Sequence, residues 1–241
     1  MRFAGLVFTP LVLAIGLGSA NATPKTISDE EVAKRLAFLE AKLNQGEKAA
    51  TLWWNVWFYG WEGLTMAQFA WALTTKDSGT RIDMAIGAAS STLGVLPLGL
   101  LPFPAKTAPQ DLAKFAANSP NTPTARRQKL IFAEHLLHAA ADDEILRRSW
   151  VNHAVSIGVS IGVGLILAVG YERPIPGLFN TIGGIALSEL QIFTQPTAAI
   201  NDLHDYQRFG ITSTPTIKQK PASIGFNVGP HSGGFSLSGR F

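Results

Sequence analysis

The residues best suited to metal or proton chemistry stand in one polar stretch, EHLLHAAADDEILRRSWVNH, which begins at Glu134. On a helix, His135, His138 and Asp142 share one face, and Glu134 lies one turn before His138. Imidazole and carboxylate groups at this spacing can bind zinc or iron. Neither HExxH nor Glu-x-x-His is present, because Leu137 stands three residues after Glu134. The competing interpretation is a solvated helix whose charges pair locally, and we favour it.

Opposite charges within the same stretch support the solvated helix. Asp143 and Glu144 stand three or four residues before Arg147 and Arg148, the spacing at which ion pairs form on one helix face. We therefore expect these side chains to pair along the helix and to remain at its surface.

Two acids interrupt long apolar runs. A carboxylate at bilayer depth costs about 3 kcal/mol unless it is paired, protonated or facing water. Glu62 and Glu189 are such acids, and each is a candidate for proton handling or for organising a bundle. Placement at an interface among tryptophans is the simpler account for Glu62. Arg81 and Asp83 are expected to pair with each other at the end of an apolar run.

Several classes of chemistry are excluded by composition. The chain of 241 residues has no cysteine, so thiolate metal sites, thiol catalysis and disulfides are excluded. No Gly-rich phosphate loop or nucleophile elbow is present, so the sequence predicts no cofactor. The net charge is +3, but the basic residues are scattered rather than clustered on a nucleic-acid face, so no nucleic-acid partner is expected.

The first 22 residues, MRFAGLVFTPLVLAIGLGSANA, predict a secretory signal peptide. A basic start, an apolar core and the small residues Ala20 and Ala22 match what a signal peptidase accepts. The mature chain is then expected to begin at Thr23, exported to a cell-envelope membrane or the periplasm. An uncleaved membrane anchor is the alternative.

Four later runs are apolar and long enough to approach the roughly 30 Å of a bilayer core: residues 51–75, 84–105, 149–171 and 177–196. Five of the six tryptophans fall in the first run, and indole rings prefer the membrane–water boundary. Amphipathic or polar helices are predicted around these runs, at 28–43, 122–148 and 196–209. Ser28 with Glu31, and Thr122 with Pro123, are the expected start signals for the first two.

The third run carries two rows of small residues at four-residue spacing. Gly158 and Gly162 form one row, and Ser160 and Gly164 belong to the other. Such rows let another helix approach closely in a membrane, whereas in water each glycine weakens a helix by roughly 1 kcal/mol relative to alanine. The sequence therefore predicts helix packing at these residues and lipid around them.

The distribution of basic residues opposes the membrane interpretation. With an exported N-terminus and four spans, only Lys76, Arg81 and Arg173 of the mature Lys and Arg residues would face the cytoplasm, where the positive-inside rule expects the excess. Three alternatives stay open: an exported soluble bundle, re-entrant helix pairs, or a retained N-terminal segment with another topology.

Together these observations predict an all-α fold. Residues 23–210 are expected to form a membrane-embedded bundle of about four hydrophobic helices with flanking amphipathic helices, and residues 211–241 a tail with a β-hairpin. The expected role is non-enzymatic: a scaffold or accessory subunit that contacts membrane lipid and a second copy or another envelope protein. The alternatives are a transport or proton-handling module built around Glu62 and Glu189, and an exported helical metalloprotein using the histidine-bearing stretch.

Overall fold

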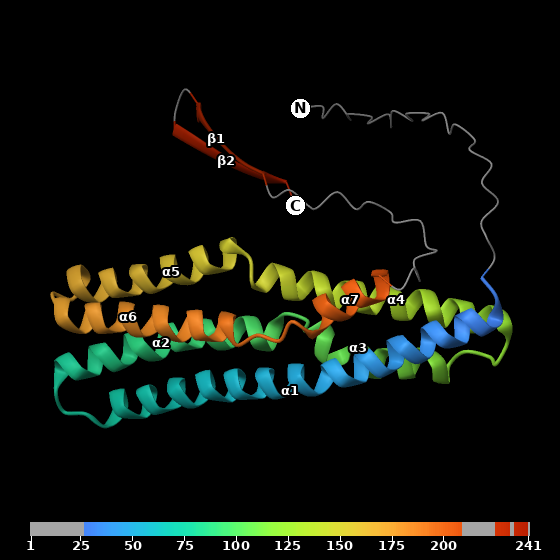
Figure 1. The fold of residues 1–241 in the computed structure, drawn as a ribbon. Helices are drawn as coiled ribbons and strands as arrows, with labels where there is room; N and C mark the ends of the chain where they lie inside the picture. The colour runs from blue at the N-terminus through green and yellow to red at the C-terminus, as the bar shows by residue number, and fades with distance from the viewer. Residues whose placement is uncertain (1–26, 209–224, 232–233, 241) are drawn as a thin grey trace, which may run out of the picture.

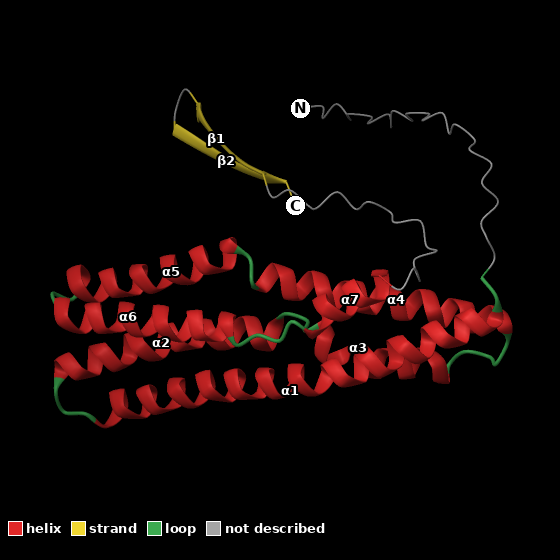
Figure 2. Cartoon of the chain, viewed as in Figure 1, coloured by secondary structure: helices red, strands yellow, loops and turns green. Residues whose placement is uncertain are grey.

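The computed structural model describes residues 27–208, 225–231 and 234–240. Its helices are α1 (Asp29–Thr74), α2 (Ser78–Leu100), α3 (Pro104–Ala117), α4 (Pro123–Arg147), α5 (Trp150–Leu165), the π-helical turn η1 (Ile166–Gly170), α6 (Pro174–Phe193) and α7 (Ala198–Arg208). The predicted all-α class is confirmed (Figure 2). In the tail, strand β1 (Gly225–His231) pairs antiparallel with β2 (Gly234–Arg240). The predicted signal peptide and most of the 211–241 tail lie outside the described residues.

A single helix, α1, runs along the body of the molecule (Figure 1). At 1.5 Å per residue its 46 residues extend about 69 Å. The sequence predicts two separate elements here, and that prediction is wrong because nothing between Asn44 and Thr51 breaks the helix. Gly46 lies in this join and faces α7, where an added Cβ would be 3.8 Å from the Cβ of Ala198.

The polar half of the body is built like a water-soluble helical bundle. It comprises residues 29–50 of α1 together with α3, α4 and α7, and these helices share one buried core. Leu39, Ala108 and Leu137 are at most 1% exposed in that core. This half therefore gains its stability from ordinary burial of leucine and alanine side chains.

The apolar half comprises residues 51–74 of α1 together with α2, α5, η1 and α6. In contrast to the polar half, it exposes many large apolar side chains at its surface. Apart from Ile131, Ile145 and Leu146 of α4, the large apolar side chains that are exposed in the described chain run from Leu52 to Leu101 and from Trp150 to Phe193. These elements form two hairpins, α1 with α2 and α5 with α6. The two connecting turns lie at the same end of the body (Figure 1).

An ion pair joins the two hairpins at their turns. The guanidinium of Arg173 donates to both carboxylate oxygens of Asp83, at 2.6 Å each. The expected pair of Arg81 with Asp83 is wrong, because side chains two residues apart on a helix point to different faces. Arg81 instead donates to the backbone oxygen of Thr75 at 3.0 Å.

Two helical stretches, Ser78–Ala117 and Trp150–Gly170, are long and apolar enough to cross a membrane by length and composition. The sequence predicts about four such helices. The remaining two runs are also helical, in α1 and α6. Amide side chains and one carboxylate lower the mean hydropathy of each of those runs.

A buried carboxylate joins α4 to α7 in the polar half. Glu144 is 1% exposed and accepts hydrogen bonds from the backbone N–H groups of Ala199 at 3.3 Å and Ile200 at 3.1 Å. The first N–H groups of a helix have no partner within that helix, and its positive end attracts an acid. Glu144 therefore caps α7.

The local ion pairs expected on α4 form only in part. Asp143 and Arg147 pair at 2.7 Å, as predicted. The expectation that Glu144 lies at the surface and pairs with Arg148 is wrong. Arg148 instead donates to the backbone oxygen of Gln195 at 3.0 Å, just beyond the end of α6.

The cap made by Glu144 gives stability a specific pH dependence. Burial raises the pKa of this carboxyl from 4.5 to about 7. Between these values the folded state keeps a proton that the unfolded state has lost, so the free energy of unfolding falls as pH rises through the window. The expected fall is about 3 kcal/mol in total, and it levels off about one pH unit above the folded-state pKa. Thermal unfolding of the purified protein between pH 4 and 8 measures it.

Glu144→Gln should lose this slope, because the amide does not titrate. Asp142→Asn, at an exposed position on the same helix, should keep it. The difference between the free energies of unfolding of the parent and of Glu144→Gln, taken at each pH, isolates the contribution of Glu144. If that free energy falls equally with pH in both proteins, the assignment to Glu144 is contradicted.

Candidate functional site

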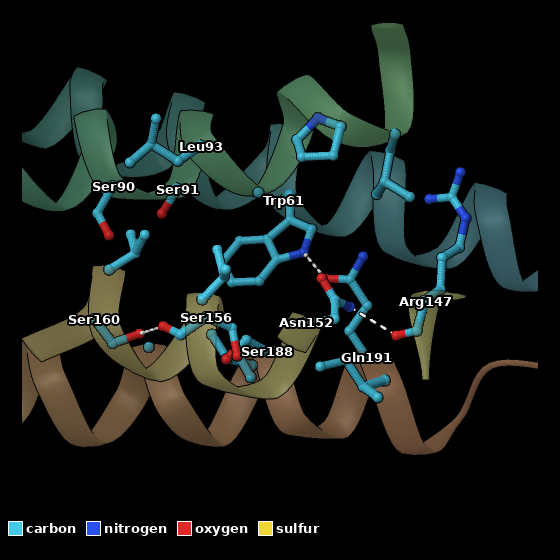
Figure 3. A pocket seen from close by; sticks show the side chains of 18 of the residues that line it. Trp61, Ser90, Ser91, Leu93, Arg147, Asn152, Ser156, Ser160, Ser188 and Gln191 are labelled. Atoms are coloured by element: carbon cyan, nitrogen blue, oxygen red, sulfur yellow. Dashed lines mark hydrogen bonds between the residues drawn. The ribbon is translucent and has the colours of Figure 1, made fainter. Parts of the chain in front are cut away.

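A cleft of about 810 Å³ lies between the two hairpins of the apolar half (Figure 3). Helices α1 and α2 line one side, and α5 and α6 line the other. Contacts are dense within each hairpin but sparse between α2 and the α5–α6 hairpin. Small residues on α2 line the cleft, namely Gly87, Ser90, Ser91 and Gly94, and the two glycines admit the side chains of Gln68 and Trp61 from α1.

The cleft carries several polar side chains within a wall that is mostly apolar. Ser90 and Ser91 on α2 lie across the cleft from Ser156 and Ser160 on α5 (Figure 3). The Ser91 hydroxyl donates to the side-chain oxygen of Gln68 at 2.8 Å, and Ser160 donates to the backbone oxygen of Ser156 at 2.9 Å. Uncharged groups of this kind can be buried cheaply because a neighbouring helix turn satisfies them.

Two tryptophans of α1 turn inward and connect it to α6. The indole N–H of Trp61 donates to the side-chain oxygen of Gln191 at 2.8 Å, and that of Trp53 donates to the backbone oxygen of the same residue at 3.2 Å. The Trp61 ring lies against Gly94, where an added Cβ would be 2.6 Å from a ring carbon. Only glycine on α2 therefore admits this ring, which forms part of the cleft wall.

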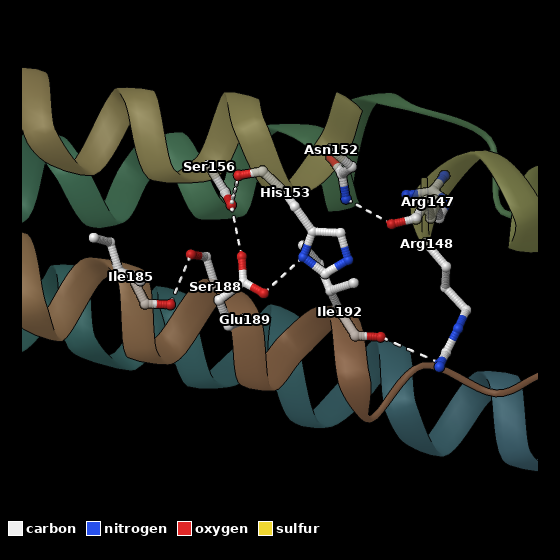
Figure 4. A network of polar contacts seen from close by, with 9 residues as sticks. All are labelled: Arg147, Arg148, Asn152, His153, Ser156, Ile185, Ser188, Glu189 and Ile192. Carbon is white, nitrogen blue, oxygen red and sulfur yellow. Dashed lines mark hydrogen bonds and ion pairs between the residues drawn. The ribbon is translucent and has the colours of Figure 1, made fainter. Parts of the chain in front are cut away.

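Glu189, one of the two acids in apolar runs, has a partner on the neighbouring helix (Figure 4). Its carboxylate oxygen lies 2.6 Å from the Nδ1 atom of His153 on α5, and Ser156 contacts the other oxygen at 3.5 Å. Both side chains of the pair are about three-quarters buried. The pair connects α5 to α6 near the C-terminal end of α6. Glu62 is not part of it, because that side chain is exposed on α1.

The four metal candidates do not come together. His135, His138 and Asp142 are exposed on α4, whereas Glu134 turns inward and accepts a hydrogen bond from the hydroxyl of Tyr206. Burial and this carboxylate raise the pKa of the Tyr206 phenol. Within the described ranges, no group of three or more His, Asp or Glu side chains is placed to hold a metal ion.

The four helix-packing candidates fall on two sides of α5. Gly164 lies where α5 crosses α6, and a Cβ there would come within 2.8 Å of the backbone oxygen of Gly177. Ser160 is buried at the same contact, against Gly184. Gly158 and Gly162 point the other way, since a Cβ on either would meet nothing within 4 Å.

The chain matches no protein-family model, no curated protein and no solved structure. Its function is therefore inferred from the geometry of the cleft and of the two halves.

The pair of His153 with Glu189 should contribute to stability, whereas the exposed Glu62 should not. Glu189→Leu leaves the imidazole without its acceptor and should lower the free energy of unfolding by about 1–3 kcal/mol. Glu62→Leu is the matched control and should change it by less than about 0.5 kcal/mol. Thermal unfolding of the purified variants measures both effects.

A double variant that removes both partners tests whether the loss of unfolding free energy in Glu189→Leu comes from the broken pair. His153→Leu combined with Glu189→Leu should recover at least half of it, because no buried polar group is left unpaired. Equal losses in Glu62→Leu and Glu189→Leu would contradict the special role of the pair.

Proposed function

We propose that the chain is an exported envelope protein, held in a membrane by its apolar half, that acts as a non-enzymatic scaffold or accessory subunit. The proposal rests on the change from buried to exposed apolar side chains between the polar and the apolar half. A bundle in water buries its apolar side chains. Only 22% of the most apolar 18 residues within Ser78–Ala117, and 17% of those within Trp150–Gly170, are buried here. An exposed apolar surface of this extent needs lipid or a partner around it.

Aromatic side chains at both ends of the apolar half support membrane placement. Trp150 is 78% exposed at the junction of the two halves, and Tyr171 is 46% exposed at the turns. They stand 21 residues apart, which corresponds to about 30 Å of helix. Trp and Tyr gather at the two interfaces of a bilayer whose hydrocarbon core is about this thick.

The basic residues still oppose this placement. The positive-inside rule counts Lys and Arg in loops of up to about 60 residues and near the ends of spans. The segment between α2 and α5, which contains α3 and α4, is short enough to be counted, and it carries more Lys and Arg than the two turns with Lys76 and Arg173. The orientation is therefore tested directly by the labelling experiment below.

Transport or proton handling is the second candidate function, and the His153–Glu189 pair is the observation that favours it. The pair lies near the junction rather than midway through the apolar half, and Glu62 is on the other hairpin. A structural connection between α5 and α6 therefore explains the pair more simply. The exported metalloprotein gains no support, since the described part of the chain has no assembled metal site.

Single-cysteine variants can report the medium around each half, because the chain has no cysteine of its own. In spheroplasts, a membrane-impermeant maleimide should label His138→Cys on the polar half. It should label Lys76→Cys, in the α1–α2 turn, only after the membrane is opened. Phe69→Cys, on the outer face of α1, should stay unlabelled until the protein is denatured.

Carbonate extraction should leave the protein in the membrane fraction. Labelling of all three cysteines in intact spheroplasts, together with release by carbonate, would show a water-soluble exported bundle and overturn the proposal.

A scaffold or accessory subunit should also have a partner, and the open side of α5 is where we expect it. Gly158→Leu adds bulk where the fold itself has space, so it should leave the folded chain intact while reducing self-association or co-purification at least tenfold. Ala89→Leu, on the exposed face of α2, is the control. Crosslinking and size measurement in mild detergent check this; a parent protein that stays monomeric and captures nothing would count against the role.

A further inference from the structure

The cleft between the hairpins has the size of a small-molecule site. Its volume of about 810 Å³ lies within the range of roughly 300–1,000 Å³ typical of ligand pockets. Apolar side chains form most of the wall along its length, with Leu93 on α2, Val155 and Val159 on α5, and Phe179 and Leu187 on α6. A hydrocarbon chain lying along the cleft would contact these side chains.

The end of the cleft at the junction differs, because hydrogen-bond donors there lack an acceptor. Gln195 lines the cleft and is 4% exposed, yet within the described chain its side-chain nitrogen has no hydrogen-bond partner. The hydroxyl of Ser149, which also lines the cleft, is buried and unpartnered among the same residues. A buried donor left without an acceptor is costly, so two at one place indicate that something else supplies the acceptor.

Charged groups at the same end favour an anionic oxygen as that acceptor. Arg147 lines the cleft, with its Nε atom paired to Asp143 and its Nη2 atom donating to the backbone oxygen of Pro102 at 2.9 Å. Arg148 donates to the backbone of Gln195 at 3.0 Å. Arg147 and its partner Asp143 therefore line the same end of the cleft as Gln195 and Ser149, whereas Arg148 contacts Gln195 only through the backbone. Guanidinium favours carboxylate and phosphate oxygens.

We propose that the cleft binds a single-chain amphiphile, with its hydrocarbon chain between the hairpins and a carboxylate or phosphate head at Gln195 and Ser149. The inference rests on the proposed membrane placement, since lipid is the source of such molecules. Rotation of the Gln195 and Ser149 side chains toward the cleft would let the headgroup accept from the glutamine amide and the serine hydroxyl, which are both fully buried here. The chain would cover the apolar wall as far as the serines of α2 and α5.

Binding of defined amphiphiles to the purified full-length mature chain in a neutral detergent tests the proposal. The probes are palmitate and hexadecyl phosphate, compared with hexadecanol and hexadecyltrimethylammonium, and native mass spectrometry counts the bound molecules. Saturable binding of one palmitate or one hexadecyl phosphate per chain is expected, and the stronger of the two identifies the head. The alcohol and the cation should bind at least tenfold more weakly.

Two pairs of variants locate the bound molecule. Ser90→Trp fills the cleft and should reduce binding at least tenfold, whereas Ala89→Trp places the same ring on the outer face of α2 and should not. Gln195→Leu should weaken binding of the anionic probes at least tenfold, and Gln207→Leu, at an exposed position of α7, should leave it unchanged. Val159→Phe replaces Ser90→Trp if circular dichroism shows that the latter does not fold.

Three results would overturn the proposal: no saturable binding of either anionic probe, equal binding of all four probes, or equal loss in Ser90→Trp and Ala89→Trp. The last would place the amphiphile on the outer surface. These outcomes are separate from the cysteine-labelling test, which reports the membrane placement whether or not the cleft binds anything.

Discussion

One continuous helix has to serve two different surroundings, and the rest of the molecule is arranged around that constraint. Residues 29–50 of α1 bury leucines against α3, α4 and α7, whereas residues 51–74 of the same helix present apolar side chains outward. The other helices pass from the polar to the apolar half near the same point along the body. Helix α4 ends and α5 begins around Ser149, and α6 ends at Phe193. The boundary between the halves is therefore a property of the whole bundle.

The placement of polar groups follows from this boundary. Charges in the apolar half are paired where helices end: Arg173 with Asp83 at the turns, and Glu189 with His153 near the junction. Between these levels the inner surface uses serine, asparagine and glutamine, which a helix backbone or each other can satisfy. An unpaired charge there would be much more costly. Glu62, exposed on α1, is a charge in the described apolar half that this arrangement does not explain.

Capping signals in the sequence were sufficient for two helix starts and insufficient for partners. Ser28 accepts from the N–H of Glu31 at 3.2 Å and Thr122 from that of Ala125 at 3.2 Å, both as the capping patterns predict. The capping box at the first of these is only half formed, because the Glu31 side chain accepts from Arg35 instead. The partners of Glu189 and Glu144 stand 36 and about 55 residues away, so no spacing rule could find them. The cleft draws several side chains from each of α1, α2, α5 and α6 and further ones from α3 and α4, so it becomes visible only after those helices are packed.

The wall of the cleft indicates what kind of molecule can occupy it. Leu93, Val155 and Phe179 are 49%, 58% and 71% exposed, so the cleft is open to its surroundings and is not a sealed void. Water in the cleft would leave these apolar side chains wetted, whereas a hydrocarbon chain would cover them. A molecule with one polar end and one hydrocarbon chain fits both parts of the wall, because its chain covers those side chains while its head accepts the hydrogen bonds that Gln195 and Ser149 lack.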